Sequence, residues 1–190
     1  MIRKALLIAV SLIALSPVVP ARAQDAPKVA KPAPASAASL LTAAQKRARA
    51  SNKQVLVVFH ASWCGWCKKL DATLLSDPQM AKLLGAQYEI VHLDVMENGT
   101  KKSLENPGGD ALLKRLGGEK AGLPFYAVLN TSGVKQGDSL RMPENQNIGY
   151  PGSPEEIAAF VGLLKSTAPR MTEADRDTIT AHLTRNAPKS

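Results

Sequence analysis

Residues 62–69 read SWCGWCKK and contain both cysteines of the 190-residue chain, Cys64 and Cys67. They closely follow the apolar run Val55–Phe59, and the residues after them have a helical pattern. We therefore expect Cys64 where a buried strand ends and a helix begins, with free backbone N–H groups directed at its sulfur. A thiolate is favoured at such a place, and the thiolate is the form that attacks disulfides. Because the two thiols are one helical turn apart, they can also close on each other, so the pair can be oxidised and reduced repeatedly.

The first 23 residues have the pattern of a cleaved secretory signal peptide. Arg3 and Lys4 precede the uncharged apolar run Ala5–Leu15, and Ala21-Arg22-Ala23 forms an A-x-A cleavage site. The apolar run is too short to span a bilayer comfortably. We therefore expect an exported protein, soluble and periplasmic, whose mature chain begins near Gln24 and has no stable membrane anchor.

Export bears on what the two cysteines do. In an oxidising compartment an isolated pair can be a structural disulfide, but two sulfurs are few for a fold that depends on disulfides. A C-x-x-C loop is also too short to remove much chain entropy from the unfolded state. The pair therefore indicates redox chemistry rather than a structural crosslink.

The formal net charge of the chain is +8, and +5 remains once the basic residues Arg3, Lys4 and Arg22 are removed with the signal peptide. The remaining lysines and arginines are scattered along the chain and are not interleaved with aromatic residues. Together with export, this pattern predicts a solvated basic surface and no nucleic-acid partner.

Helices and strands alternate along the rest of the chain. Strands are expected at Gln54–His60, at Tyr88–Val95, at Phe125–Leu129 and, after a turn, from Val134 onward. Helices are expected at Leu40–Ala50 with Ser39 as cap, after the cysteines, from Asp77-Pro78, from Asn106-Pro107, from Ser153-Pro154 and over Thr172–Arg185. This order predicts an α/β fold with a central mixed sheet of about four strands and helices on both faces.

The expected organisation is a signal peptide at 1–23, an Ala/Pro-rich linker at 24–38, one domain at 39–168 and a C-terminal helical extension at 169–190. The apolar face of the extension is thin and is carried by Ile179 and Leu183, so the extension either docks on the domain or stays mobile. The segment Met96–Gly122 is interpreted as a plain surface insertion, with a role in shaping substrate access as the alternative.

With these elements in place, the chain resembles the thioredoxin-like superfamily over roughly Ser39–Ala168. Val57–Lys68 matches the strand, the W-C-x-x-C motif and the helix start of that family, and Gly122–Phe125 falls where the family has a cis-proline facing the cysteines. The branch that it resembles most is the exported thioredoxin-family thiol:disulfide oxidoreductases similar to the C-terminal domain of a membrane reductant transporter. The resemblance implies a thioredoxin-like fold.

The resemblance also implies roles for individual residues. Cys64 would be the exposed attacking thiol, and Cys67 would be the partly buried resolving thiol. The substrate-binding residues that it implies are Trp63, Gly65, Trp66, Leu123 and Pro124. The redox-active Cys64–Cys67 disulfide would be the only redox group, with no other cofactor. The partners would be exported protein thiols or disulfides and a redox partner that re-reduces or re-oxidises the pair.

Three positions depart from the family pattern. The buried acid six residues before the first cysteine is Val58 here, which leaves the proton of Cys67 to another group or to water. His60 and His92 stand where the family often has an aromatic residue and a lysine, and they are candidates for tuning the thiolate; a packed or hydrogen-bonded histidine is the alternative for His60. The residues between the cysteines include no histidine to stabilise the thiolate, which favours a reductant over a strong oxidant.

Two other functions fit the same residues. Cys64, Cys67 and His60 could be three ligands of a metal ion, but a structural zinc site needs four and the chain has no second C-x-x-C or histidine pair, so copper fits better than zinc. We expect no metal. A thioredoxin-like adaptor would bind partners without turnover, although the intact motif with its flanking tryptophans counts against it.

Overall fold

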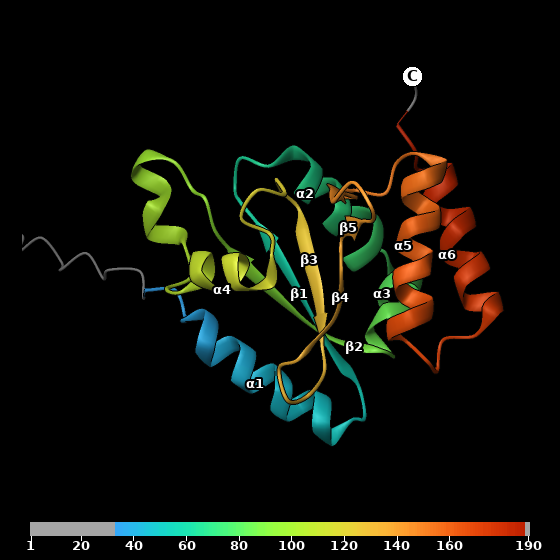
Figure 1. Cartoon of the computed structure of the whole chain (residues 1–190), viewed down its shortest axis with the longest axis horizontal. Helices are drawn as coiled ribbons and strands as arrows, with labels where there is room; N and C mark the ends of the chain where they lie inside the picture. The colour runs from blue at the N-terminus through green and yellow to red at the C-terminus, as the bar shows by residue number, and fades with distance from the viewer. Residues whose placement is uncertain (1–32, 189–190) are drawn as a thin grey trace, which may run out of the picture. The chain divides into compact units, whose positions relative to one another are not determined.

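The computed structural model describes residues 33–188, and its core is a four-stranded sheet in the order β2-β1-β3-β4 (Figure 1). The strands are β1 (Gln54–His60), β2 (Tyr88–Asp94), β3 (Phe125–Leu129) and β4 (Lys135–Asp138). β1 runs parallel to β2 and antiparallel to β3, and β3 and β4 form an antiparallel hairpin. The predicted α/β fold with a mixed sheet is therefore confirmed.

β1 lies in the middle of the sheet because its side chains are buried on both faces. Alternate residues contribute to two different clusters of the core: Val55, Val57 and Phe59 to one, Leu56 and Val58 to the other. At its carboxyl end, His60 is paired with Asp94 of β2, and the N–H of Val95 donates to the carbonyl of His60 at 2.9 Å. The chain therefore leaves both parallel strands at the same edge of the sheet.

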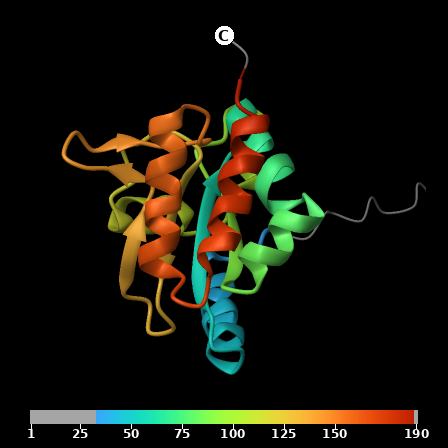
Figure 2. The same cartoon turned by 90° about the vertical axis from the view of Figure 1, so that its right-hand side faces the viewer.

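Helices cover both faces of the sheet. α1 (Ala37–Ala50) and α4 (Gly109–Leu116) contribute buried residues to one cluster of the core. The other cluster contains residues of α2 (Gly65–Leu70), the π-helical turn η1 (Asp71–Leu75), α3 (Pro78–Gly85), α5 (Pro154–Thr167) and α6 (Glu173–Arg185). Figure 2 shows α5 and α6 side by side over this face. After β4 the chain forms a small hairpin of β5 (Leu140–Arg141) and β6 (Gln146–Asn147).

The C-terminal helix α6 is docked, which decides between the two alternatives left open for it. Ile179 and Leu183 are fully buried in the same cluster as α3 and α5. Thr172 caps the helix as predicted, in a reciprocal capping box with Asp175. The helix is therefore part of the core rather than an appendage.

The start of α1 differs from the prediction. Its N-cap is Ser36, whose hydroxyl oxygen accepts the N–H of Ser39 at 3.1 Å, so Ser39 lies inside the helix. Tertiary contacts decide between the two serines, because Ala37 is buried and its N–H donates to the carbonyl of Pro107 at 2.9 Å. The predicted boundary between linker and domain at residue 38 is therefore too late.

The start of α4 also differs. The helix begins at Gly109, after Gly108 in the left-handed region (φ 81°), and not at Asn106-Pro107. The Asn106 carboxamide is used elsewhere, since its Oδ1 accepts the N–H of Asp94 at 2.7 Å. A Cβ at Gly109 would lie 2.8 Å from Val95 Cγ1, so only glycine lets α4 approach the end of β2 this closely.

The interpretation of Met96–Gly122 as a plain surface insertion is wrong for its second half. Leu112, Leu113 and Leu116 of α4 are buried and complete the core over α1. Within this segment, the 3-10 helix η2 (Gly99–Leu104) has no buried residue. The segment therefore combines a core helix with a surface turn close to the end of β2.

Two predictions concern residues that the structure does not describe. The signal peptide expected at 1–23 lies wholly outside residues 33–188, and so does most of the expected linker. Among the helices of residues 33–188, none is both long enough and apolar enough to cross a membrane.

Candidate active site

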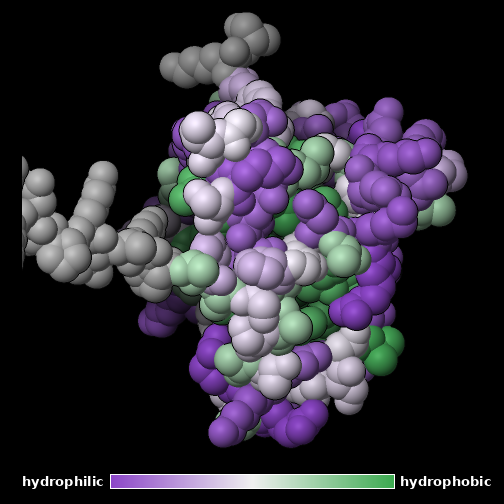
Figure 3. Space-filling view, turned by 90° about the vertical axis from the view of Figure 1, so that its left-hand side faces the viewer, coloured by the Kyte–Doolittle hydropathy of each residue, from purple (hydrophilic) through white to green (hydrophobic). Residues whose placement is uncertain are grey.

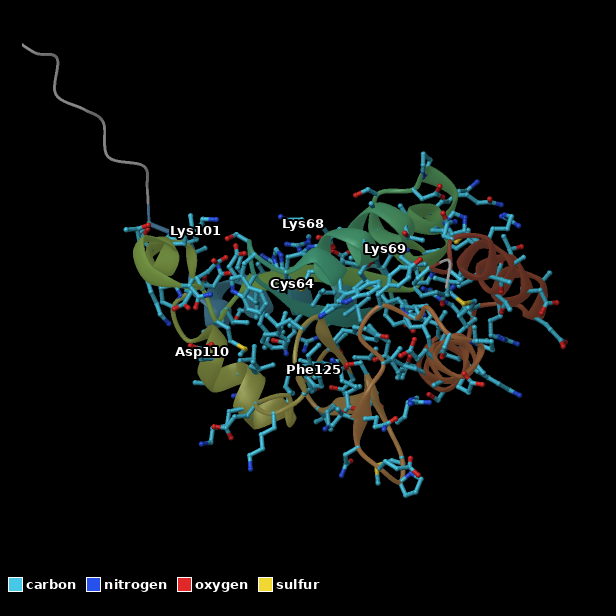
Figure 4. All side chains as sticks on the ribbon, turned by 90° about the horizontal axis from the view of Figure 1, so that it is seen from above. Cys64, Lys68, Lys69, Lys101, Asp110 and Phe125 are labelled. Atoms are coloured by element: carbon cyan, nitrogen blue, oxygen red, sulfur yellow. A yellow bond between two sulfur atoms is a disulfide. The ribbon has the colours of Figure 1, made fainter. Side chains whose placement is uncertain are left out.

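The two cysteines lie where the sequence places them, at the junction of β1 and α2. Cys64 is the N-cap of α2, and its Sγ accepts the N–H of Cys67 at 3.1 Å. The two sulfurs are bonded to each other, with the Cα atoms 5.3 Å apart. In Figure 4, which looks onto this end of the sheet, Cys64 lies at the start of α2, with Lys68 and Lys69 further along the helix. The geometry directs one backbone donor at the sulfur of Cys64.

The expectation of an exposed Cys64 and a partly buried Cys67 is wrong for this disulfide form. Cys64 is 3% exposed and Cys67 is 2% exposed, because Ala61 and Leu123 pack against the pair. The exposed side chains are those of the two tryptophans, Trp63 at 49% and Trp66 at 53%. A partner protein can therefore contact both tryptophan rings, whereas very little surface of the two cysteines is accessible to it.

The structure brings Leu123 and Pro124 to the site from the chain just before β3. Leu123 packs against the cysteine pair, and the Leu123–Pro124 peptide bond is cis, as the resemblance implies. Gly65 has no atom within 4 Å of the position that a Cβ would occupy, so the backbone at the first residue of α2 is open to an approaching group.

Trp66 and Pro124 line the same groove, which we call the Trp66 groove. Its volume is ≈ 790 Å³, and Leu123, Ile148 and Tyr150 are among its lining residues. The Trp66 ring is stacked on the ring of Tyr150, with centroids 5.9 Å apart and planes at 18°. The Lys69 ammonium lies 5.8 Å from the Trp66 centroid and 4.9 Å from that of Tyr150, within the range of a cation–π contact. The wall of the groove is therefore mainly aromatic and aliphatic, with the Lys69 ammonium at its edge and Glu156 among its lining residues.

Trp63 borders a second groove of ≈ 620 Å³, the Trp63 groove, which differs in chemistry. Most of its charged lining comes from η2, α4 and the chain around them: Glu97, Lys102, Asp110, Lys114 and Glu119. The Trp63 indole N–H donates to the carbonyl of Met96 at 2.8 Å, which fixes the ring against the loop after β2. Figure 3 shows the side of the molecule that carries η2 and α4, where hydrophilic surface predominates and hydrophobic residues show in hollows between.

The two histidines proposed to tune the thiolate contact each other and two carboxylates. The rings of His60 and His92 meet edge to face with centroids 5.2 Å apart. His60 Nε2 lies 3.5 Å from Asp94 Oδ1, and His92 Nε2 lies 3.0 Å from Asp71 Oδ1. The packed alternative therefore describes His60 in the disulfide form, and His92 is held by its hydrogen bond with Asp71. Val58, at the position of the expected acid, is buried in the apolar core.

The residue of the site that the sequence interpretation missed is Glu97, which is 1% exposed. Its carboxylate accepts the N–H of Ser62 at 2.5 Å and the Ser62 hydroxyl at 2.8 Å. Burial alone would raise the pKa of Glu97, but the two bonds from Ser62 and the charges of Lys101 and His60 outweigh it and hold that pKa below its ordinary value. The parallel pairing of β1 with β2 is the signal that could have found it, because that pairing brings the chain after Asp94 beside the chain after His60.

The metal-site alternative gains no support from the geometry. Among the side chains of residues 33–188, no three histidines, cysteines, aspartates or glutamates form a group that could hold a metal ion. His60, the expected third ligand, is paired with Asp94 instead.

Comparison with known proteins gives a family match and several relatives. The chain matches the family described as thioredoxin-like over residues 37–131, half of its length. It is 34% identical over 95 residues to the thiol:disulfide interchange protein DsbD of Salmonella typhimurium, an alignment that covers 50% of this chain and 15% of that protein. The chain thus spans only a small part of this relative's length.

Solved structures that are similar to this chain include a disulphide isomerase from Xylella fastidiosa Temecula1. It is 20% identical, with a TM-score of 0.47, and the alignment covers 84% of this chain and 99% of that chain. The C-terminal domain of DsbD from Neisseria meningitidis in its oxidised form is 25% identical, with a TM-score of 0.40, over 56% of this chain and 84% of that chain.

Proposed function

The chain belongs to the thioredoxin-like family, and from that premise we propose that it is a thiol:disulfide oxidoreductase that works through Cys64 and Cys67. One observation carries the proposal: the only two cysteines form a disulfide at the start of α2, with the N–H of Cys67 directed at the sulfur of Cys64. A donor in that position stabilises negative charge on Cys64 when the pair is reduced.

The proposed reaction has two exchange steps. In the reduced protein the Cys64 thiolate attacks one sulfur of a substrate disulfide, forms a mixed disulfide and releases the other substrate sulfur, which takes up a proton. The Cys67 thiolate then attacks the sulfur of Cys64, closes the Cys64–Cys67 disulfide and releases the second substrate thiol. Two electrons pass from the protein to the substrate, so the reaction needs no cofactor beyond the two sulfurs.

The proposed direction is reduction of exported protein disulfides. The residues between the cysteines, Gly65 and Trp66, include no histidine that would stabilise the thiolate, and a less stabilised thiolate favours a reductant. A redox partner outside the cytoplasm would then re-reduce the pair. His60 and His92 are proposed as groups that adjust the charge near the site when the thiols form.

The proposed place for the substrate is the Trp66 groove. An extended peptide carrying the reactive disulfide would lie along Leu123 and Pro124, with apolar side chains against Trp66 and Tyr150. The charged Trp63 groove is less suited to apolar side chains. Gly65 leaves room for the peptide to approach Cys64 from above the helix start.

The proposal is tested by dithiol-coupled reduction of a protein disulfide with the full mature chain. Cys64→Ser is expected to lose activity to the uncatalysed background, since the attacking thiol is gone and the remaining thiol, Cys67, has no second thiol in the chain to release its substrate. Cys67→Ser is expected to lose turnover but to keep the first exchange step. Full activity in the Cys64→Ser protein would refute the proposal.

The direction is tested separately by equilibrating the protein with glutathione redox buffers. A reductant is expected to have a potential below that of the glutathione pool, at about −240 mV or lower. A potential near that of strong oxidants, about −120 mV, would reverse the proposed direction and leave the oxidoreductase proposal standing.

A further inference from the structure

The loop Met96–Glu97, between β2 and η2, contacts the turn that precedes Cys64. It makes three hydrogen bonds to that turn: two from Ser62 to the Glu97 carboxylate and one from the Trp63 indole to the Met96 carbonyl. Among residues 33–188, Glu97 is the only charged residue that is buried. Burying a carboxylate costs free energy unless hydrogen bonds replace its lost hydration. The bonds from Ser62 supply that replacement, so Glu97 and the turn before Cys64 depend on each other.

The loop is itself held in place. Met96 lies in the left-handed region at φ 55°, which a residue with a side chain adopts only at a cost. The N–H of Glu97 donates to Glu105 Oε1 at 2.7 Å, and Lys102 bonds the same oxygen at 3.1 Å. Contacts from both sides therefore fix the Glu97 carboxylate before any substrate arrives.

The carboxylate lies within a bounded distance of the Cys64 backbone. It is 2.5 Å from the N–H nitrogen of Ser62, and two residues of chain span at most about 7 Å. It is thus within roughly 10 Å of the backbone of Cys64, about one Debye length at 0.1 M salt, and burial weakens the screening further. The titratable groups around it are His60 of β1, Lys101 and Lys102 of η2, and Glu105 after η2.

The geometry points to Glu97 as a positioning residue of the Cys64 site, one that holds the turn before Cys64 and places a fixed negative charge within about 10 Å of the Cys64 backbone. This inference rests on the proposed oxidoreductase function. The negative charge opposes formation of the Cys64 thiolate, whereas the Cys67 N–H favours it. Because an unstabilised thiolate leaves the reduced form less stable, the charge makes the pair a stronger reductant.

The test is the pH dependence of Cys64 alkylation by iodoacetamide in the Cys67→Ala chain, where Cys64 is the only thiol. Glu97→Gln keeps the shape, can still accept the Ser62 N–H and removes the charge; it also replaces the oxygen that accepts the Ser62 hydroxyl with an NH2 donor, a change for which Ser62→Ala is the control. It is expected to lower the midpoint of the alkylation profile by about one pH unit, the effect of one charge at about 10 Å in a protein. A midpoint equal to that of the Glu97 protein would overturn the inference.

Two matched variants separate charge from geometry. Ser62→Ala removes one hydrogen bond and keeps the charge, so its midpoint should stay near that of the parent. Glu119→Gln removes an exposed charge from the rim of the same groove and should shift the midpoint by less than about 0.2 pH unit. A shift in Glu119→Gln as large as in Glu97→Gln would mean that surface charge in general is responsible, and would also overturn the inference.

A second measurement removes dependence on the Gln variant folding. In the reduced Cys67→Ala chain, the ¹³Cδ signal of Glu97 is expected to show a second inflection at the pH where Cys64 ionises, and a single inflection would contradict the coupling. Alkylation reports on the thiol whether or not the protein turns over substrate. If Glu97→Gln shifts the alkylation midpoint as expected but the native protein has no disulfide reductase activity, the proposed function alone is refuted. If the native protein is active but Glu97→Gln does not shift the midpoint, this inference alone is refuted.

Discussion

The two tryptophans beside the cysteines are almost equally exposed, yet they have different surroundings. Trp63 is fixed by a hydrogen bond to the Met96 carbonyl and borders a groove lined with charged side chains. Trp66 is stacked on Tyr150 under the Lys69 ammonium and borders a groove with aromatic and aliphatic lining. The sequence W-C-G-W-C is nearly symmetric, but the surroundings of its two tryptophans make the site asymmetric. The Trp63 side holds the reactive turn, and the Trp66 side offers apolar surface to a peptide.

The largest effect that this comparison predicts is on the use of protein substrates by Trp66→Ala. Loss of the ring removes an aromatic contact from the proposed binding surface, so kcat/KM for a protein disulfide should fall about 10- to 30-fold. The fall should appear as a higher KM, with kcat little changed. The rate with a small dithiol-coupled disulfide should change less than about twofold. Trp66→Phe, which can still stack on Tyr150, is the control. Equal losses for large and small substrates would contradict a binding role.

A smaller effect is predicted for Trp63→Phe, and on stability rather than on substrate use. The variant leaves the Met96 carbonyl without its donor, so the free energy of unfolding should fall by about 1 kcal/mol. The corresponding fall in Tm is about 2–4 °C for a chain of this size. Trp66→Phe should change Tm less, because its ring is held by stacking. If Trp66→Phe were the more destabilised of the two, the comparison would be reversed.

The smallest effect is a pH dependence on the Trp63 side. The pKa of Glu97 lies below its ordinary value of 4.5 in the folded chain, so the unfolded chain binds the proton more readily. The stabilisation by the charged form is then fully present above about pH 4.5 and is lost as pH falls through the folded pKa.

Urea unfolding of the native and Glu97→Gln proteins at several pH values between 7 and 3 measures this effect. The difference in unfolding free energy should be constant from pH 7 to about pH 5 and should shrink below that. A difference that grows on acidification would mean that burial, rather than the bonds from Ser62, controls this carboxyl group.

Much of the fold could be predicted because local signals and burial agree. β1 has the predicted bounds, since a β-branched run without a polar residue fits only a strand covered on both faces. Asp77 before Pro78 and Ser153 before Pro154 cap their helices as predicted, because cap and proline act within one turn. The starts of α1 and α4 could not be predicted, because each is decided by a hydrogen bond between segments far apart in the sequence.

The site divides in the same way. The position of Cys64 at the helix start follows from the local sequence and is confirmed. Its burial is only partly local: Ala61 is near in the sequence, but Leu123 precedes β3, the strand that pairs with β1 on the side opposite β2. Glu97 lies in a stretch of polar residues that reads as loop, and only the register of β1 with β2 places it under Ser62.

The proposed exchange through Cys64 is tested most directly by trapping its mixed disulfide. The Cys67→Ala chain, reduced and then mixed with a protein disulfide, should form a stable covalent adduct through Cys64 in mass spectrometry, since no second thiol can release the substrate. The Cys64→Ala chain, treated in the same way, should form little or none, because Cys67 lies inside α2 and the backbone N–H that favours a thiolate is directed at Cys64 instead. Failure of the Cys67→Ala chain to form any adduct would contradict turnover and would favour an adaptor that binds its partners without exchanging disulfides.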